Sequence, residues 1–376
     1  MENIHYLDNS ATTQVLEEAA QAALRLMRQD YGNPSALHAM GKQARDAMEQ
    51  ARGQVAGAMG CKAEQVIFTS CGTESINTAI QSAARKGKAF GRHIVSTQIE
   101  HKATLDTLKA LEQEGFQVTL VPPEKDGTVS CDRVLEAVRP DTILLTMMEV
   151  NSETGAILPT AAAMEKAKEK APHCLCHIDG VQAYCKLPIS LGGVDFLSVS
   201  GHKIGAMKGV GALYCKDPRS LRPLLHGGGQ EGNRRSGTEG LPQIVSMGGA
   251  SALRAEKREE SQRHMAALRQ SLIEGLSAMP CPVRINSPQN GAAHILNISP
   301  EKGRSEVLLR VLSDEGVYVS GGSACARGRR SHVLEAMKLP AAAIDAALRV
   351  SFCPENTQED VKAFLAGFQK ALGFFL

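Results

Sequence analysis

The motif Ser-Gly-His-Lys at positions 200–203 contains the side chain best suited to chemistry in this sequence, the amine of Lys203. An apolar run over 196–199 predicts a strand before the motif, and glycines follow it. A lysine there is poorly explained by packing, but its amine can condense with an aldehyde. Asp179 lies 24 residues earlier, after another apolar run, and a carboxylate can keep a pyridine nitrogen protonated. Together these residues predict a site for pyridoxal phosphate (PLP), bound as a Schiff base.

A second reactive group, the thiol of Cys325, ends the small-residue segment 320–325. Such a segment is typical of an exposed loop. Arg327, Arg329 and Arg330 follow, and nearby cations favour the thiolate form of a cysteine. The alternative is a buried structural cysteine, the usual state of this residue, with the arginines on an ordinary solvated loop. We favour a nucleophile, which together with PLP suggests sulfur transfer.

The composition describes a large globular protein without a strong bias of charge. The 376 residues are 43% hydrophobic and have a formal net charge of +2, from 42 basic and 40 acidic side chains. This balance argues against direct binding of nucleic acid or of an anionic membrane surface. The first residues lack the basic and apolar layout of a signal peptide, and no apolar run is long enough to span a membrane. We therefore expect a cytoplasmic protein.

The ten cysteines are expected to be free thiols, as is usual in a large intracellular protein. The pattern His-Cys-Leu-Cys-His at 173–177 invites interpretation as a metal site. On a strand, however, its cysteines face one side and its histidines the other, so they cannot share one tetrahedral ion. We expect no metal site.

Apolar runs alternate with helix-like stretches through the first part of the chain. Continuous apolar strands separated by helices predict an α/β fold. In this fold a mostly parallel sheet of the seven-stranded type is covered by helices on both faces. The predicted strands are residues 66–70, 93–97, 116–121, 142–146, 175–178, 196–199 and 210–214.

The chain changes character after Gly248. A charged helical stretch over 252–278 precedes short strands and a final helix that Thr357 is expected to cap, with Asp360 three residues on. The predicted short strands are residues 293–298, 317–319 and 348–352. We therefore predict two domains. A large PLP-binding α/β domain spans 16–250, and a small α+β domain is formed by 1–15 and 251–376, which carries Cys325.

Ligands of open α/β sheets bind beyond the carboxyl ends of the strands, and several polar groups fall there. Gly72 and Thr73 open a helix after the first strand, where backbone amides and a hydroxyl suit a phosphate. His101 and Asn151 follow later strands, and an imidazole can stack on a ring or move protons. Each has an ordinary alternative as a cap, turn or surface residue. Their convergence with Asp179 favours a cofactor site.

The sequence resembles the cysteine desulfurases of the NifS/IscS type, which belong to the class V aminotransferases, PLP enzymes of fold type I. The resemblance runs almost from end to end, and its blocks occur in the family's order. These blocks are residues 6–13, 32–35 with His38, 69–74, 100–102, 150–151, 179–182, 200–203, 227–230, 235–238 and 322–325.

The resemblance implies a role for each residue around the cofactor ring. Lys203 holds PLP covalently and, once released, removes the Cα proton of the substrate. Asp179 contacts the pyridine nitrogen and Gln182 the ring hydroxyl. His101 lies over the ring as a cofactor-binding and catalytic residue, with Asn151 beside it.

The resemblance also implies how the phosphate and the substrate are held. Arg349 clamps the substrate carboxylate, and Asn151 assists in binding the substrate. The cofactor phosphate is bound by Gly72, Thr73, Ser200 and His202, joined by Thr238 from the partner subunit of a homodimer.

The implied reaction is the PLP-dependent conversion of L-cysteine to L-alanine. Cys325 attacks the substrate sulfur as a thiolate and carries it as a persulfide to an acceptor protein. The sulfur then serves iron–sulfur cluster assembly, tRNA thiolation or another use. Two alternatives stay open, a selenocysteine lyase acting on L-selenocysteine and another class V lyase or transaminase. A catalytically silent sulfur-relay protein is disfavoured because Lys203, Asp179 and Arg349 are all present.

The sequence departs from the family pattern near the site. Cys71 stands in the phosphate loop where glycine is usual, Ser152 stands where asparagine is usual, and 206–207 are Ala-Met in place of Gly-Pro. Only five residues, 326–330, separate Cys325 from the helix start at 331, fewer than in long-loop members. These differences remove no chemical role. The short segment after Cys325, however, leaves open which protein accepts the sulfur.

Overall fold

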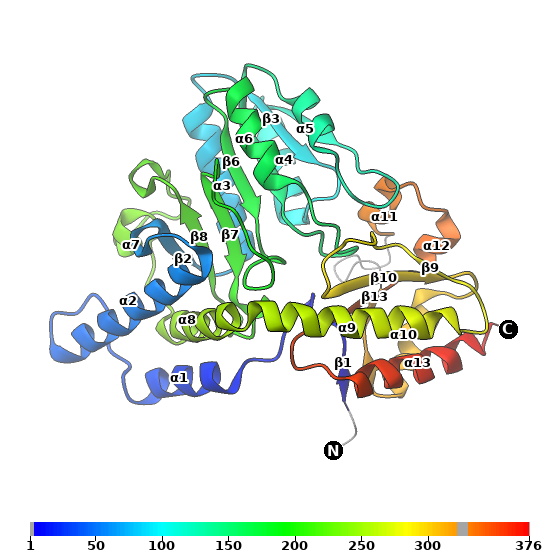
Figure 1. The fold of residues 1–376 in the computed structure, drawn as a ribbon. Coiled ribbons are helices and arrows are strands. Elements are labelled where there is room, and N and C mark those ends of the chain that lie inside the picture. Colours follow the sequence, from blue (N-terminus) through cyan, green and yellow to red (C-terminus); the bar gives the residue numbers. More distant parts are fainter. Residues whose placement is uncertain (1–3, 322–329, 376) are drawn as a thin grey trace.

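A central seven-stranded sheet organises the structure, a computed structural model that describes residues 4–321 and 330–375 (Figure 1). β8 runs antiparallel to both of its neighbours, and the other neighbouring pairs are parallel. This confirms the predicted α/β fold with a mostly parallel sheet. In spatial order the strands are β2 (Val66–Thr69), β8 (Gly211–Cys215), β7 (Phe196–Ser200), β6 (Leu175–Asp179), β5 (Thr142–Met148), β3 (His93–Thr97) and β4 (Gln117–Val121).

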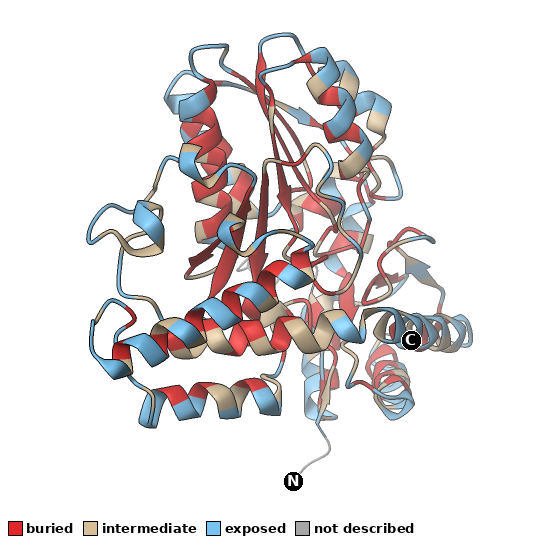
Figure 2. Cartoon of the chain, turned by 60° about the vertical axis from the view of Figure 1, so that its left-hand side comes forward, coloured by how far each residue is buried: buried red, intermediate tan, exposed pale blue. Residues whose placement is uncertain are grey.

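Helices cover both faces of this sheet because side chains alternate along each strand. On β3, Ile94 belongs to a core that it shares with α3 (Gly72–Gly87) and α4 (Lys102–Gln113). Its neighbour Val95 belongs to the core on the opposite face. Figure 2 shows the result, buried strands between helices whose outer sides are exposed. The helices of that second core include α5 (Cys131–Ala137), α6 (Thr160–Lys170) and α8 (Leu241–Glu256).

Further helices extend this second face. α1 (Glu17–Arg28) and α2 (Ala39–Met59) both pack against α8, and Figure 1 shows the three lying side by side. The remaining short elements of this part are η1 (Ala63–Gln65), η2 (Gly201–Lys203), η3 (Pro218–Ser220) and α7 (Gln230–Asn233).

The register of the parallel strands brings their carboxyl ends together at one edge of the sheet. Met148 of β5 pairs with Asp179 of β6, and Asp179 in turn pairs with Ser198 of β7. The loops that follow β3, β5, β6 and β7 therefore meet, which is where open sheets of this type bind their ligands.

A second, antiparallel sheet is built mostly from the C-terminal part of the chain. Its core contains Phe352, Phe364 and Phe368, and it also contains Leu7 from the N-terminal segment. A separate parallel pair joins β1 (His5–Tyr6) to β11 (Val317–Tyr318). The four strands in spatial order are β12 (Ser320–Gly321), β13 (Leu348–Ser351), β10 (Ile295–Pro300) and β9 (Val283–Ile285). The helices of this region are α9 (Arg258–Ser277), α10 (Ser305–Asp314), α11 (His332–Ala336), α12 (Ala341–Asp345) and α13 (Gln358–Leu372).

The charged stretch predicted over 252–278 is divided between two helices. α8 ends at Glu256 and α9 begins at Arg258, because Lys257 (φ −96°, ψ 13°) leaves the helical conformation. The break lets α8 pack in the core of the large sheet and α9 in the core of the second sheet. The final helix begins as predicted, since Thr357 and Asp360 form the reciprocal bonds of a capping box.

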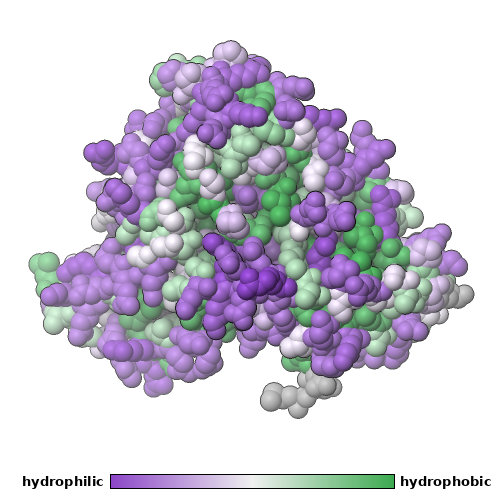
Figure 3. Space-filling model, viewed as in Figure 1, coloured by the Kyte–Doolittle hydropathy of each residue, from purple (hydrophilic) through white to green (hydrophobic). Residues whose placement is uncertain are grey.

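The face of the molecule seen in Figure 1 is mainly polar. Figure 3 shows a mostly hydrophilic face on which hydrophobic residues gather toward the centre. Within the described parts of the chain, every helix is too short or too polar to cross a membrane.

Candidate active site

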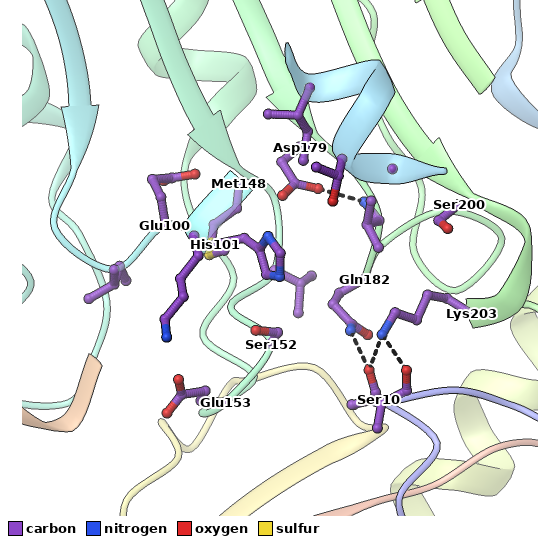
Figure 4. Close-up of a pocket in the computed structure, with 18 of the residues that line it drawn as sticks. Ser10, Glu100, His101, Met148, Ser152, Glu153, Asp179, Gln182, Ser200 and Lys203 are labelled. Atoms are coloured by element: carbon purple, nitrogen blue, oxygen red, sulfur yellow. Dashed lines mark hydrogen bonds between the residues drawn. The ribbon is translucent and has the colours of Figure 1, made fainter. Parts of the chain in front are cut away.

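A cavity of about 320 Å³ opens at the carboxyl ends of the strands, where the sequence predicts a site (Figure 4). Its walls come from the loops after β3, β5, β6 and β7, the start of α3, the N-terminal segment, α11 and β13. Size and position are those of a small-molecule site. The predicted site residues that line it are Gly72, Thr73, His101, Asp179, Gln182, Ser200, His202, Lys203 and Arg349.

Lys203 enters the cavity from the short helix η2, directly after β7. Its Nζ donates to the carbonyl oxygens of Ser10 at 2.5 Å and Ala11 at 2.7 Å (Figure 4). Gln182 Nε2 donates to the same Ser10 oxygen at 2.9 Å. The N-terminal segment thus supplies backbone acceptors that hold the amine of Lys203 in one place.

Asp179 ends β6 with its side chain almost fully buried. Its Oδ1 accepts a hydrogen bond from the Val181 amide at 3.0 Å. Burial raises the pKa of Asp179, whereas the charges of His101 and Lys203 and the Val181 hydrogen bond act in the opposite direction. A buried carboxylate of this kind is best stabilised by a cationic partner in the cavity.

The start of α3 forms a recess that backbone groups can reach. A Cβ on Gly72 would lie 2.9 Å from Val181 Cγ2 and 3.4 Å from Ser200 Cβ, so only glycine leaves this wall open. Ser200 Oγ is buried and has no hydrogen-bond partner among the described residues. A free hydroxyl beside a helix N-terminus suits a phosphate, which accepts from both.

The two histidines of the cavity differ in environment. Burial lowers the pKa of His202 to about 4, so its imidazole is neutral at pH 7. The His202 Nδ1 lies 3.2 Å from Thr12 Oγ1. His101 is exposed and caps α4, accepting from the Ala103 amide at 3.1 Å through Nδ1. Figure 4 shows its ring directed toward the middle of the cavity.

Arg349, a residue of β13, contributes a buried guanidinium to the cavity wall. Its Nη2 donates to Asp8 Oδ1 at 2.7 Å, and its Nη1 donates to the Ser152 carbonyl oxygen at 2.9 Å. Nε has no partner among the described residues. A guanidinium with a donor to spare can bind a further carboxylate.

Two predicted residues do not line the cavity, and a third cannot be placed in it or outside it because it is not among the described residues. Asn151 Nδ2 donates to the Ile99 carbonyl oxygen, and its Oδ1 accepts from the amides of Glu153 and Thr154, so its side chain stabilises a turn. Thr238 is exposed and does not line this cavity. Cys325 lies outside the described residues. The predicted roles of these three residues remain predictions.

Sequence reasoning missed several residues of the cavity. Glu100 and Glu153 are both buried in its wall, and burial raises their pKa values to about 8 and about 7. Ser331 Oγ donates to Glu153 Oε2 at the start of α11, and His332 also lines the cavity. Glu100 directly precedes the predicted His101, but its burial leaves no signal in the sequence.

Residues 5–364 of the chain match the family described as aminotransferase class-V. The chain belongs to this family, and PLP is the family's cofactor.

Comparison with individual relatives assigns the chain to a smaller group within this family. A "Cysteine desulfurase IscS" from Methanosarcina thermophila is 42% identical over 364 residues, covering 96% of this chain and 90% of the relative. A solved structure of a "NIFS-LIKE PROTEIN" has a TM-score of 0.93 at 37% identity, covering 98% of this chain and 99% of that one. A structure of "SspA in complex with cysteine" has a TM-score of 0.82 at 33% identity, covering 94% and 99%. The chain thus groups with the cysteine desulfurases of the NifS/IscS type, and its fold is PLP fold type I.

The residues of the cavity fit this cofactor. The recess beside Gly72 and the free hydroxyl of Ser200 suit its phosphate. The buried carboxylate of Asp179 suits a protonated pyridine nitrogen, and the amine of Lys203 suits its aldehyde.

Proposed function

We propose that this protein is a PLP-dependent cysteine desulfurase that converts L-cysteine to L-alanine and loads the sulfur on Cys325. The observation that carries the proposal is the meeting of Lys203, Asp179 and Arg349 in one cavity, from η2, β6 and β13. The relatives support the same activity, since one is named a cysteine desulfurase and another was solved with cysteine.

In this proposal the cavity holds the cofactor through separate groups for each of its parts. When bound, PLP supplies an electron sink for the electron pair released at the substrate Cα. Lys203 would hold it covalently, Asp179 would face the pyridine nitrogen and Gln182 the ring hydroxyl. The phosphate would be held by Gly72, Thr73, Ser200 and His202.

Lys203 is the group that we propose moves the proton at the substrate Cα. Once its amine is released from the cofactor and uncharged, it accepts this proton and becomes an ammonium. The carbonyl oxygens of Ser10 and Ala11 then accept hydrogen bonds from two N–H groups of this ammonium and stabilise its charge. They lie 2.5 and 2.7 Å from Nζ. His101, whose ring projects into the cavity, is positioned to assist proton transfer.

Arg349 would orient the substrate by its carboxylate. Its guanidinium is already fixed by Asp8 and by the Ser152 carbonyl oxygen, so little side-chain freedom is lost on binding. The Asn151 side chain holds the adjacent turn in place, so a role of this residue in the substrate site would be indirect.

Cys325 would take the sulfur. Its thiolate attacks the substrate sulfur, an S–S bond forms and the C–S bond breaks. The electron pair of the broken bond stays with the carbon, which takes up a proton to give alanine. The persulfide then passes to an acceptor protein.

We also propose that the enzyme is a homodimer in which Thr238 completes the partner's phosphate site. Its exposure and its position away from the cavity of its own subunit support this arrangement. We further propose the two-domain division at residues 16–250 against 1–15 with 251–376. The separate core around the second sheet supports it, although α11 and α12 pack in the core of the large sheet.

The activity is tested with purified enzyme, borohydride and mass spectrometry. We expect reduction to fix a pyridoxyl group on Lys203 and L-cysteine to yield equal amounts of alanine and transferable sulfur. Cys325→Ala should bind PLP but lose this turnover. Turnover of L-cysteine that survives in Cys325→Ala would contradict the mechanism. If this variant still turned over L-selenocysteine, that result would favour the lyase alternative.

A further inference from the structure

Glu100 is a buried acid in the cavity wall to which the proposed reaction gives no role. It lies between β3 and α4 and is the residue just before His101. Its exposed fraction is 0%, yet it is one of the residues that line the cavity. Figure 4 shows it on the same side of the cavity as Met148 and Asp179.

The two oxygens of the Glu100 carboxyl have different surroundings. Oε1 accepts a hydrogen bond from Thr97 Oγ1 at 2.7 Å. Oε2 is buried and has no partner among the described residues. A carboxylic acid accounts for this asymmetry better than a carboxylate, because an ionised oxygen without a donor is costly to bury.

The neighbours of Glu100 also disfavour its charge. The ionisable group that acts on its carboxyl is Asp179, an acid, and its pKa is raised to about 8, chiefly by burial. No cation forms an ion pair with Glu100 within the described residues. His332 Nε2 donates to its carbonyl oxygen at 3.0 Å, but burial lowers the pKa of this imidazole, which is therefore neutral at pH 7.

Asp179 is the better placed of the two acids to be ionised. The charges of His101 and Lys203 and the amide of Val181 all favour its carboxylate form. Two neighbouring acids that are both buried do not ionise together at low cost, so the proton remains on Glu100, whose carboxyl has no ion-pair partner among the described residues.

We propose that Glu100 is a positioning residue that remains a neutral carboxylic acid, so that Asp179 is the anion of this neighbouring pair of buried acids. The acid form keeps Oε1 as an acceptor for the Thr97 hydroxyl, which holds the carboxyl against the end of β3. It also places no second negative charge beside Asp179. This inference rests on the proposed PLP site.

The test is a matched pair of acid-to-amide substitutions, Glu100→Gln and Asp179→Asn, each of which preserves shape and removes the ability to ionise. Infrared spectra of the apoprotein at neutral pH should show the carbonyl stretch of a buried carboxylic acid. Because burial also raises the pKa of Glu153 to about 7, the contribution of Glu100 is taken from difference spectra. The band should be lost between the wild type and Glu100→Gln and retained between the wild type and Asp179→Asn. In the wild type it should disappear as the pH is raised.

Titration with PLP gives a second readout. We expect the dissociation constant to change by less than about threefold in Glu100→Gln and to rise by about tenfold or more in Asp179→Asn. The proposal is overturned if the acid band is missing from the wild type, or if Glu100→Gln weakens binding as much as Asp179→Asn. If no form binds PLP, the proposed function fails, and the infrared band still decides the protonation of Glu100.

Discussion

Arg349 of β13 and Asp8 of the N-terminal segment form an ion pair, with Nη2 and Oδ1 2.7 Å apart. The pair joins residues 341 positions apart, and Arg349 lines the cavity where we assign the substrate carboxylate. Asp8 therefore has two opposing effects. It holds the guanidinium in place, and it occupies a donor that a substrate carboxylate would use.

Replacing Arg349 by lysine should impair substrate binding without displacing the cofactor. A lysine offers a point charge in place of a planar fork, so it cannot bond Asp8, Ser152 and a substrate together. We expect kcat/KM for L-cysteine to fall by about 30-fold or more, a loss of about 2 kcal/mol. The absorbance of bound PLP should be unchanged, and a variant that loses PLP as well would contradict this assignment.

Asp8→Asn separates the two effects of the ion pair. The amide oxygen can still accept from Arg349, but the competing negative charge is gone. We expect the KM for L-cysteine to fall by about threefold, with a loss of unfolding free energy of about 1 kcal/mol measured in urea. A rise in KM would show instead that the Asp8 charge is required to orient the guanidinium.

Ser200→Ala tests the phosphate recess. Because Ser200 Oγ has no partner among the described residues, its removal should not lower the free energy of unfolding of the apoprotein. The PLP dissociation constant should rise by about tenfold, the worth of one hydrogen bond to a charged group. Equal PLP affinity in the variant and the wild type would place the phosphate elsewhere.

The pH dependence of stability should reveal the buried histidine of β6. His177 lies between Thr146 Oγ1 and Ser198 Oγ, and burial lowers its pKa to about 3 from an ordinary value of 6.5. The unfolded chain therefore binds a proton between these values that the folded chain does not, so stability falls as the pH is lowered.

The measurement is urea unfolding of wild type and His177→Gln at several pH values below neutrality. From pH 6.5 downward, the wild type should lose about 1.4 kcal/mol per pH unit more than the variant. If the free energy of unfolding changed equally with pH in the two proteins, the imidazole of His177 would take up its proton in the folded protein as readily as in the unfolded chain.

The central fold was predictable because its strands are short, continuous apolar runs. The strand predicted at 93–97 is β3 with the same ends, and the runs before Asp179 and Lys203 are β6 and β7. Ligand-binding positions follow from such strands by a general rule, since parallel strands end at one edge. That rule is why the sequence alone indicates Gly72, Asp179 and Lys203 as site residues.

Other features had no local signal. The antiparallel direction of β8 depends on its pairing with β2 and β7, and the break at Lys257 depends on the two cores that α8 and α9 join. The acceptors for Lys203 are backbone carbonyls of residues 10 and 11, which any residue type would supply. Only the packing of the N-terminal segment against η2 makes them part of the site.

The reactive groups of this protein, an amine, a carboxylate and a guanidinium at the ends of strands, can be read from residue types and the order of apolar runs. Their charge states and partners cannot, because desolvation and Coulomb interactions depend on groups from distant segments. Glu100 and Asp179 are the same kind of acid at two strand ends. Folding places His101 and Lys203 where their charges stabilise the carboxylate of Asp179, whereas the charge that acts on Glu100, among the described residues, is that of Asp179 itself.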